Sequence, residues 1–503
     1  MNEQQICARI GALIEYAEEK GLADPRDRLY YRNTLLGLLG LDADTEASPV
    51  TGLSLQTILD DLSGYAFEKG LIPDAGVTAK DLFDTELMGL FTPLPSVVEE
   101  LFDAYEKGSS PKAATDFFYT LCKDTNYIRT ERVAKDLRWE YTGKYGVLDI
   151  TVNLSKPEKD PKAIAAARTS AQTAYPKCQL CAENVGYRGR LDHPARQNLR
   201  TVPVELAGER WLFQYSPYVY YNEHCIVLNS AHVPMKITPA TFARQLDFVE
   251  RFPHYFVGSN ADLPIVGGSI LTHDHFQGGH YVFAMEKAKT LASFRFPGFE
   301  DLTVEWLCWP LSVLRLTGTK EKVQSLSEKL LAAWRTYSDP ERQIFAETDG
   351  TPHNTITPIA RRKGGLYQMD LVLRNNLTTP EHPDGLYHPH KEKHHIKKEN
   401  IGLIEVMGLA VLPSRLKNEL ACVEERIGNG LPLDTPETEK HAEWVKTILA
   451  SREVTKETLR DILSEEVGKV FESVLEDAGV YKPDENGKAG ICAFVASLGG
   501  QLL

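Results

Sequence analysis

Two histidines and a glutamine alternate in the segment from Gly267 to His280, and glycine pairs flank them. On an extended backbone alternate residues project to the same side, so His273, His275 and Gln277 would converge on one small volume. An imidazole nitrogen can attack phosphorus, and an amide N–H can hold phosphoryl oxygens on which charge develops. The pattern therefore predicts transfer of a phosphoryl or nucleotidyl group, with His275 as the nucleophile.

The chemistry places a condition on His275. Its imidazole is neutral for much of the time at pH 7, because the unperturbed pKa is about 6.5. Only one ring nitrogen can attack, so a carbonyl or a side chain must hold the other as N–H. A covalent phosphoramidate would then allow a ping-pong exchange between two sugar phosphates. The alternative is a histidine pair that binds a metal ion or is hydrogen-bonded in a core, with Gln277 as a loop-capping amide.

A Cys-x-x-Cys pair, Cys178 and Cys181, precedes His232 and His273 in the chain. Two thiolates and two imidazoles form a tetrahedral zinc site where the fold brings them together. The long separations differ from those of a compact zinc finger. A redox pair or two buried cysteines are the other interpretations.

Arginines gather in an otherwise acidic chain, at Arg188, Arg190, Arg196 and Arg200. The planar guanidinium suits phosphate and ribose oxygens, which favours substrate binding over a solvated basic loop. Arg374, at the end of an expected strand, is a further candidate for ligand contact. The basic run 361–363 is expected to be an exposed turn.

A second His-x-His, His388 and His390, lies in the most basic segment of the chain. It could form a second metal site, a phosphate-facing loop or a solvated loop. Because strands and a helix are expected beside each His-x-His, the chain could also contain an internal duplication.

Composition excludes several classes of protein. The net charge of −14 over 503 residues argues against non-specific binding to nucleic acid or to anionic membranes. No apolar run approaches the roughly 18–20 residues of a membrane span, and the N-terminus lacks the layout of a signal peptide. Eight cysteines are too sparse for a disulfide scaffold, so we expect a cytoplasmic protein with reduced thiols.

Periodicity indicates an α+β architecture. Helical spacing dominates residues 1–125, strands and a helix alternate over 126–300 and 301–412, and helical spacing returns over 413–503. We expect strands over 147–154, 211–215 and 224–229, and a strand leading into the His-rich loop. We expect helices over 239–251, capped by Thr238, and over 321–337. A hairpin of 353–360 and 366–374 would be joined by a turn over 361–365.

Three segments together resemble one family: 178–190, 214–225 and 267–279. They are similar to UDP-glucose–hexose-1-phosphate uridylyltransferase (galactose-1-phosphate uridylyltransferase) in its longer bacterial type, within the histidine-triad superfamily. The resemblance covers most of the chain. It implies two histidine-triad-like α+β halves with an antiparallel sheet, framed by N- and C-terminal helical regions, and it implies dimers.

The resemblance also implies a reaction. Uridylyl would pass from UDP-glucose to His275 and then to galactose 1-phosphate, while Gln277 holds the phosphate. The asparagine of the family that contacts phosphate maps loosely onto Asn260. The other residues expected to bind substrate are Arg188, Arg190, Arg196, Ser269 and Arg374. No cofactor is required for this chemistry.

The resemblance also bears on zinc, because the shorter type of the enzyme, whose motif is His-Pro-His-Gly-Gln, binds this metal. Its zinc ligands would correspond here to Cys178, Cys181, His232 and His273. Asp274 and Phe276 depart from the shorter pattern, so the resemblance leaves zinc as an expectation.

Two other functions are compatible with the same residues. A hydrolase or phosphorylase of dinucleoside polyphosphates would use the same nucleophile with water or phosphate as acceptor. A non-catalytic nucleotide- or metal-binding protein would use His273 and His275 only as ligands. A pure metal site needs neither Gln277 nor a glycine-lined loop, which favours an enzyme.

Overall fold

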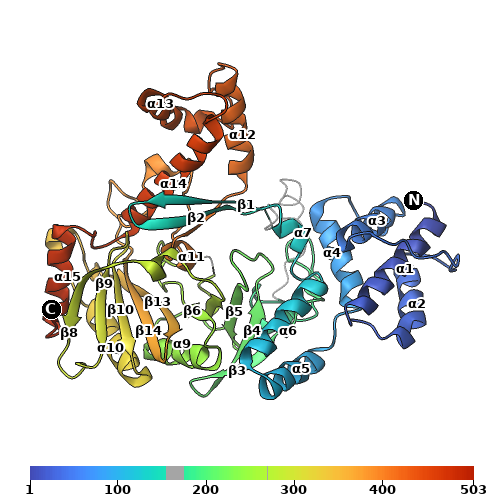
Figure 1. Cartoon of the computed structure of the whole chain (residues 1–503), viewed down its shortest axis with the longest axis horizontal. Coiled ribbons are helices and arrows are strands. Elements are labelled where there is room, and N and C mark those ends of the chain that lie inside the picture. The colour runs from blue at the N-terminus through green and yellow to red at the C-terminus, as the bar shows by residue number, and fades with distance from the viewer. Residues whose placement is uncertain (155–174, 269) are drawn as a thin grey trace.

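In a computed structural model, which describes residues 1–154, 175–268 and 270–503, eleven of the described strands form one antiparallel sheet (Figure 1). Their order is β16 (Gln501–Leu502), β8 (Thr290–Arg295), β9 (Thr303–Leu307), β10 (Val313–Gly318), β14 (Leu366–Asn375), β13 (Asn354–Lys363), β6 (Phe256–Gly258), β7 (His275–Gly279), β5 (Cys225–Asn229), β4 (Glu209–Tyr215) and β3 (Val202–Leu206). The sequence prediction of an α+β fold built on an antiparallel sheet is confirmed.

The sheet repeats one five-strand pattern. A three-strand meander (β3-β4-β5), a helix and two strands make the first half, and β7 lies between β5 and β6. The second half repeats this order with β8-β9-β10, a helix, β13 and β14, and β14 lies between β10 and β13. The halves join where Gly258 of β6 pairs with Ile359 of β13. The predicted internal duplication is therefore present as a repeated topology.

The second His-x-His is not the counterpart of the first in this repeat. The first half carries His275 on its last strand, β7, whereas His388 and His390 follow β14 in a loop. Strand β14 contains no histidine. The duplication is one of fold, and only the first half presents an imidazole from this strand.

Helices α9 (Pro239–Arg251) and α10 (Lys320–Trp334) pack against β13 and β14. Thr238 caps α9 and Pro239 is its first residue, which confirms the predicted start. The apolar stripe of α10, which ends at Trp334, is buried in the same core. Phe276 of β7 reaches this core, where its ring stacks on Trp211 at 4.8 Å. Because side chains alternate along a strand, His275 and Gln277 face the opposite side of the sheet.

Further units surround the sheet (Figure 1). A small sheet of β1 (Leu137–Gly143), β2 (Gly146–Val152) and β15 (Leu409–Leu412) packs with α14. The other described α-helices are α1 (Glu3–Glu19), α2 (Arg28–Leu38), α3 (Leu55–Glu68), α4 (Val77–Gly89), α5 (Pro95–Gly108), α6 (Pro111–Asp124), α7 (Thr130–Val133), α11 (Leu403–Val406), α12 (Arg415–Gly428), α13 (Ala442–Ser451), α14 (Leu459–Ala478) and α15 (Glu485–Ser497). Helices α1–α4 share a core of their own, whereas α5 and α6 join the core beneath the sheet. The domain limits taken from the sequence stay a prediction.

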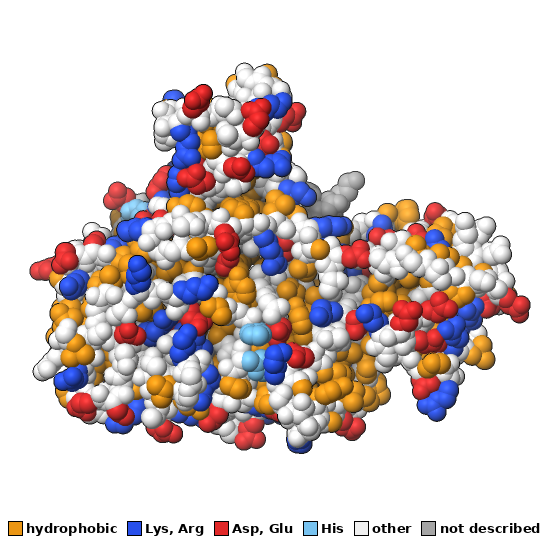
Figure 2. All heavy atoms as spheres, in the orientation of Figure 1, with side chains coloured by type: hydrophobic (Ala, Val, Ile, Leu, Met, Phe, Trp, Pro, Cys, Tyr) orange, Lys and Arg blue, Asp and Glu red, His pale blue; other side chains and the backbone are white. Residues whose placement is uncertain are grey.

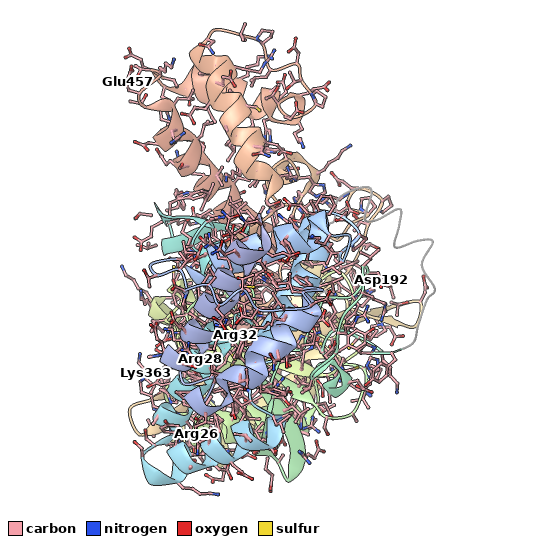
Figure 3. All side chains as sticks on the ribbon, turned by 90° about the vertical axis from the view of Figure 1, so that its right-hand side faces the viewer. Arg26, Arg28, Arg32, Asp192, Lys363 and Glu457 are labelled. Carbon is pink, nitrogen blue, oxygen red and sulfur yellow. The ribbon has the colours of Figure 1, made fainter. Side chains whose placement is uncertain are left out.

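The surface mixes charges of both signs. Acidic and basic side chains are interspersed over the face shown in Figure 2. Figure 3 shows Arg26, Arg28 and Arg32 on the N-terminal helical unit, and Glu457 on the unit that projects at the other end of this view. Among the described residues, no helix combines the length and apolar character that a membrane crossing requires. All eight cysteines are free thiols.

The hairpin of the second half corrects one prediction. Strand β13 continues to Lys363, which pairs with Leu366, so only Gly364 and Gly365 make the turn. Arg361 is not in an exposed turn: it is buried and donates to Asp370 at 2.7 Å. Arg315 binds the same carboxylate at 2.7 Å, and together the two guanidinium groups lower the pKa of this buried acid to about 2 against the desolvation that raises it. A buried carboxylate needs such partners, and their positions depend on strand pairing.

Candidate active site

His275 opens strand β7 and is buried. Its Nδ1 lies 2.8 Å from the carbonyl oxygen of His273. A carbonyl oxygen only accepts, so Nδ1 carries the proton and Nε2 keeps its lone pair. Burial lowers the pKa of His275 to about 4, which keeps the ring neutral at pH 7. The ring therefore meets the condition that the sequence set for a nucleophile.

Gln277 lies two residues along the same strand, on the same face as His275. Its Oε1 is 3.0 Å from Nε2 of His224, which directly precedes β5. The side chain of Gln277 is half-buried, so part of it is open to a ligand. Imidazole and amide thus stand side by side on the face of the sheet away from α9.

The two glycines before the motif, Gly267 and Gly268, lie close against other residues of the same loop. A Cβ at Gly268 would lie 2.6 Å from Nδ2 of Asn260, and one at Gly267 would lie 2.7 Å from the carbonyl oxygen of Ala261. Side chains are therefore excluded here by the crowding of the loop. This crowding is a structural reason for glycine at both positions.

His273 precedes β7 and belongs with the cysteines. Its Nδ1 lies 3.3 Å from Sγ of Cys178 and 3.7 Å from Sγ of Cys181, while Nδ1 of His232 lies 3.1 Å from Sγ of Cys181. The two sulfur atoms are 3.5 Å apart. The ring of His273 therefore contacts the thiols, and the expectation that all three motif side chains converge on one volume is wrong for His273.

These distances fit a zinc ion. Zn–S bonds of about 2.3 Å and Zn–N bonds of about 2.0 Å in a tetrahedron place neighbouring donor atoms roughly 3.3–3.8 Å apart. Cys178, Cys181, His232 and His273 each point one donor atom into a common space, all within 4.8 Å of one another. Nε2 of His273 donates to the carbonyl oxygen of Asn229 at 2.8 Å, which leaves Nδ1 unprotonated for a metal. The cluster can hold structural zinc.

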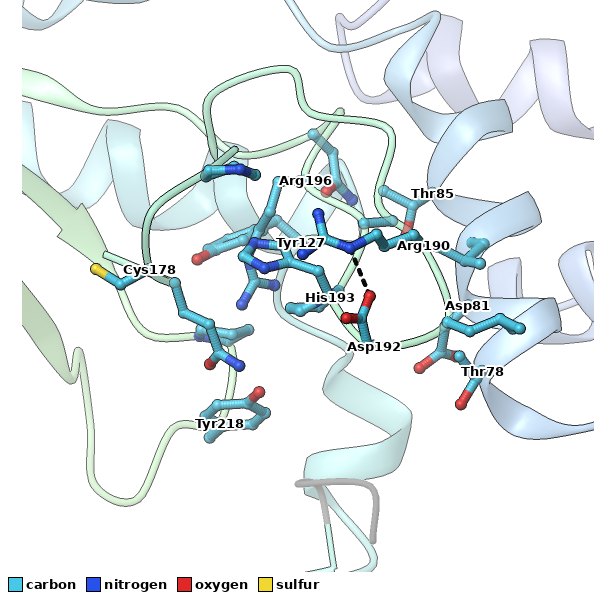
Figure 4. Close-up of a pocket in the computed structure, with 18 of the residues that line it drawn as sticks. Thr78, Asp81, Thr85, Tyr127, Cys178, Arg190, Asp192, His193, Arg196 and Tyr218 are labelled. Atoms are coloured by element: carbon cyan, nitrogen blue, oxygen red, sulfur yellow. Dashed lines mark hydrogen bonds and ion pairs between the residues drawn. The ribbon is translucent and has the colours of Figure 1, made fainter. Parts of the chain in front are cut away.

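A cavity of about 710 Å³ adjoins the cysteine cluster (Figure 4). Cys178 and the residues 270–272 line it, next to His273. Arg190, which is paired with Asp192 at 2.5 Å, follows Gly189, whose backbone packs against Leu82 of α4, and Arg196 lies over the ring of Tyr127. Three parts of the chain thus bound the cavity. They are the segment between β6 and β7 (the motif loop), the segment from Cys178 to Arg200 (the arginine-rich loop) and the N-terminal helices.

The remaining candidates lie in different surroundings. Arg188 is exposed, whereas Arg200 is buried and donates to four backbone carbonyl oxygens. Arg374 is also buried and donates to the carbonyl oxygen of Ile401 at 2.9 Å. Asn260 accepts from the backbone N–H of Leu403 at 2.8 Å, with its amide beside Gly268. Ser269 lies outside the described residues. Substrate contact stays a prediction for all six candidates: Arg188, Arg190, Arg196, Asn260, Ser269 and Arg374.

Comparison of the sequence with known proteins identifies a family. The model of the family described as galactose-1-phosphate uridyl transferase matches over residues 22–234 for its N-terminal domain and 248–469 for its C-terminal domain. Galactose-1-phosphate uridylyltransferase of Fusobacterium nucleatum is 50% identical over 509 residues, covering 99% of this chain and 100% of the relative. The protein of the same name from Bacillus subtilis is 47% identical over 99% of this chain and 98% of its own length. The chain belongs to the galactose-1-phosphate uridyl transferase family.

This membership confirms the resemblance seen in the sequence. The first match ends after β5 and the second begins within α9, so together the two matches include strands of both halves of the sheet. A solved structure of yeast Ap4A phosphorylase Apa2 is a remote match, with 12% identity, a TM-score of 0.30, and coverage of 62% of this chain and 97% of that chain. A similarity of that size supports no inference about the site.

Sequence reasoning on this uridyl transferase relative missed two features. His224 stands within a segment that carries the family resemblance, yet nothing in its spacing points to Gln277. The second feature is Asp262, which ties the segment between β6 and β7 to the second half by accepting from Thr355 at 2.5 Å and from Arg335 at 3.0 Å. All three contacts join residues far apart in the chain, so only the fold reveals them.

Proposed function

We propose that this chain transfers uridylyl from UDP-glucose to galactose 1-phosphate through a covalent uridylyl group on His275. The observation that carries the proposal is the hydrogen bond from Nδ1 of His275 to the carbonyl oxygen of His273, which leaves Nε2 unprotonated on the face of β7 that also carries Gln277. The names of the relatives support the choice of substrates.

The reaction has two displacements. In the first, Nε2 of His275 forms a bond to the α-phosphorus of UDP-glucose while the bond to the bridging oxygen breaks, and glucose 1-phosphate leaves. In the second, a phosphate oxygen of galactose 1-phosphate attacks the same phosphorus, the P–N bond breaks, and UDP-galactose leaves. The carbonyl oxygen of His273 stabilises the positive charge on the uridylylated ring by accepting from Nδ1. Gln277 would donate to the non-bridging oxygens in both steps.

The cavity supports a role for the arginine-rich loop in this proposal. Arg190 and Arg196 line a space large enough for part of a nucleotide sugar, beside the loop that leads to His275. Arg190 is held by Asp192 and by the hydroxyl of Tyr187 at 2.8 Å, so its guanidinium is positioned before substrate arrives. Asn260 would contribute an amide from the adjoining loop.

Zinc is the second part of the proposal. Cys178, Cys181, His232 and His273 would hold the ion, and its chemistry there would be structural, tying the motif loop to the arginine-rich loop. No step of the transfer requires it. The cytoplasmic location expected from the cysteine content and the homodimer implied by the family resemblance stay predictions; sedimentation velocity would measure the second.

The decisive experiment uses UDP-glucose labelled in the α-phosphate. Intact mass and peptide mapping should show uridylyl on His275, and galactose 1-phosphate should discharge it as UDP-galactose. His275→Ala is the control and should carry no label. Release of UMP instead would favour a hydrolase, and unchanged nucleotide with no adduct would favour a binding protein.

A further inference from the structure

His224 is a buried imidazole that the reaction above does not use. It directly precedes β5, and β5 pairs with β7 so that Ile226 stands opposite Gln277. The ring lies against two tyrosine rings, with centroid distances of 4.6 Å to Tyr221 and 5.3 Å to Tyr220. These neighbours fix the plane of the imidazole. Its Nε2 then points at Oε1 of Gln277, 3.0 Å away.

The other nitrogen of His224 decides the direction of that hydrogen bond. Nδ1 is buried and has no hydrogen-bond partner among the described residues. If Gln277 donated to His224, Nδ1 would have to carry a proton with nothing to receive it. If His224 donates from Nε2, Nδ1 is left as an unpaired acceptor, and buried unpaired N–H groups are rarer than buried unpaired acceptors. The second arrangement is favoured.

Burial supports the same protonation state. It lowers the pKa of His224 to about 4, so that one proton remains on the ring at neutral pH. That proton sits on Nε2 and is donated to Oε1 of Gln277. The amide nitrogen of Gln277 is thereby turned away from His224.

We propose that His224 is a positioning residue, which holds the amide of Gln277 with its N–H groups toward the phosphoryl oxygens. This inference rests on the proposed function. Without His224 the amide can turn over, and its carbonyl oxygen then faces the anionic phosphoryl group. A donor would be replaced by a repelling acceptor in a fraction of the molecules.

The test measures the single-turnover rate of uridylyl transfer to His275. His224→Phe keeps an aromatic ring and removes the donor, and it should lower the rate about 10–100-fold, as loss of an orienting group typically does, with little change in KM. His224→Gln offers a new amide donor and should recover part of the rate. His254→Phe is the matched control, because His254 is a half-buried histidine whose Nε2 contacts Thr115 instead. It should transfer at the rate of the unaltered chain.

A double-mutant comparison separates positioning from general damage. In a Gln277→Ala background, His224→Phe should cost nothing further, because its effect passes through the missing amide. A full rate in His224→Phe, or the same fold-loss in both backgrounds, would overturn the inference while leaving the proposed function standing. If His224→Phe does not fold, His224→Asn, whose shorter side chain does not reach Gln277, should show the same loss. Absence of label in the unaltered chain would instead overturn the proposed function.

Discussion

The carbonyl oxygen of His273 lies 2.8 Å from Nδ1 of His275, so one residue serves two sites. Its side chain belongs to the cysteine cluster, and its backbone sets the tautomer of the imidazole that would attack phosphorus. Any displacement of His273 would therefore change the direction of the His275 ring. This geometry explains how a structural metal could matter to the chemistry without contacting substrate.

Substitution of Gln277 tests the phosphate-binding amide. Gln277→Glu would place a carboxylate against the phosphoryl oxygens, and kcat should fall about 10²–10³-fold, the usual cost of losing a donor to developing negative charge. Rapid-quench assays with labelled UDP-glucose would measure it, with thermal unfolding as the control for folding. Full activity would rule out the role given to this amide.

Metal analysis tests the cysteine cluster. The purified chain should contain about one zinc per molecule, and Cys181→Ser should reduce this content and lower the unfolding temperature, because the ion links segments far apart in the chain. Cys492→Ser is the control, since that thiol lies outside the cluster. Metal content measured by mass spectrometry, equal and negligible in all three proteins, would contradict the zinc hypothesis.

Removal of the buried acid of the second half should destabilise the protein. Asp370→Asn leaves Arg315 and Arg361 without their shared carboxylate, and the expected loss is about 3–5 kcal/mol. Asp301→Asn, at an exposed pair with Lys322, should cost no more than about 1 kcal/mol. Thermal unfolding would compare the two variants. Equal midpoints would show that the buried ion pairs stabilise the fold no more than the exposed pair does.

The stability of the chain should fall as the pH drops from about 6.5 to 4. Burial lowers the pKa of His224 from 6.5 to about 4, so within this window the unfolded chain binds a proton that the folded chain does not. The contribution of His224 is fully present above the window and decreases through it, by up to about 3 kcal/mol. In His224→Gln this group no longer titrates.

The unfolding temperatures of the unaltered chain and of His224→Gln should therefore approach each other as the pH falls through the window. Scans at several pH values would measure the difference. A constant difference would show that His224 is protonated equally in both states.

Local signals in the sequence determined a large part of the fold. A threonine cap followed by Pro239 defines the start of α9, and the alternation from Val147 onward predicts β2, because these signals depend only on neighbours along the chain. Likewise the types and spacing of His275 and Gln277 are enough to indicate phosphoryl chemistry. The long motifs around them sufficed to indicate the family.

Contacts between distant segments were decided by tertiary structure alone. Cys181 and His232 are 51 residues apart, yet Sγ and Nδ1 lie 3.1 Å from each other. Arg361, which was expected in a turn, lies in β13 and donates to Asp370 inside the sheet. The donor for Gln277 comes from His224, 53 residues away. Strand pairing and burial set these distances, and both depend on the whole chain, since a polar group becomes costly to leave unpaired only once folding has removed water from around it.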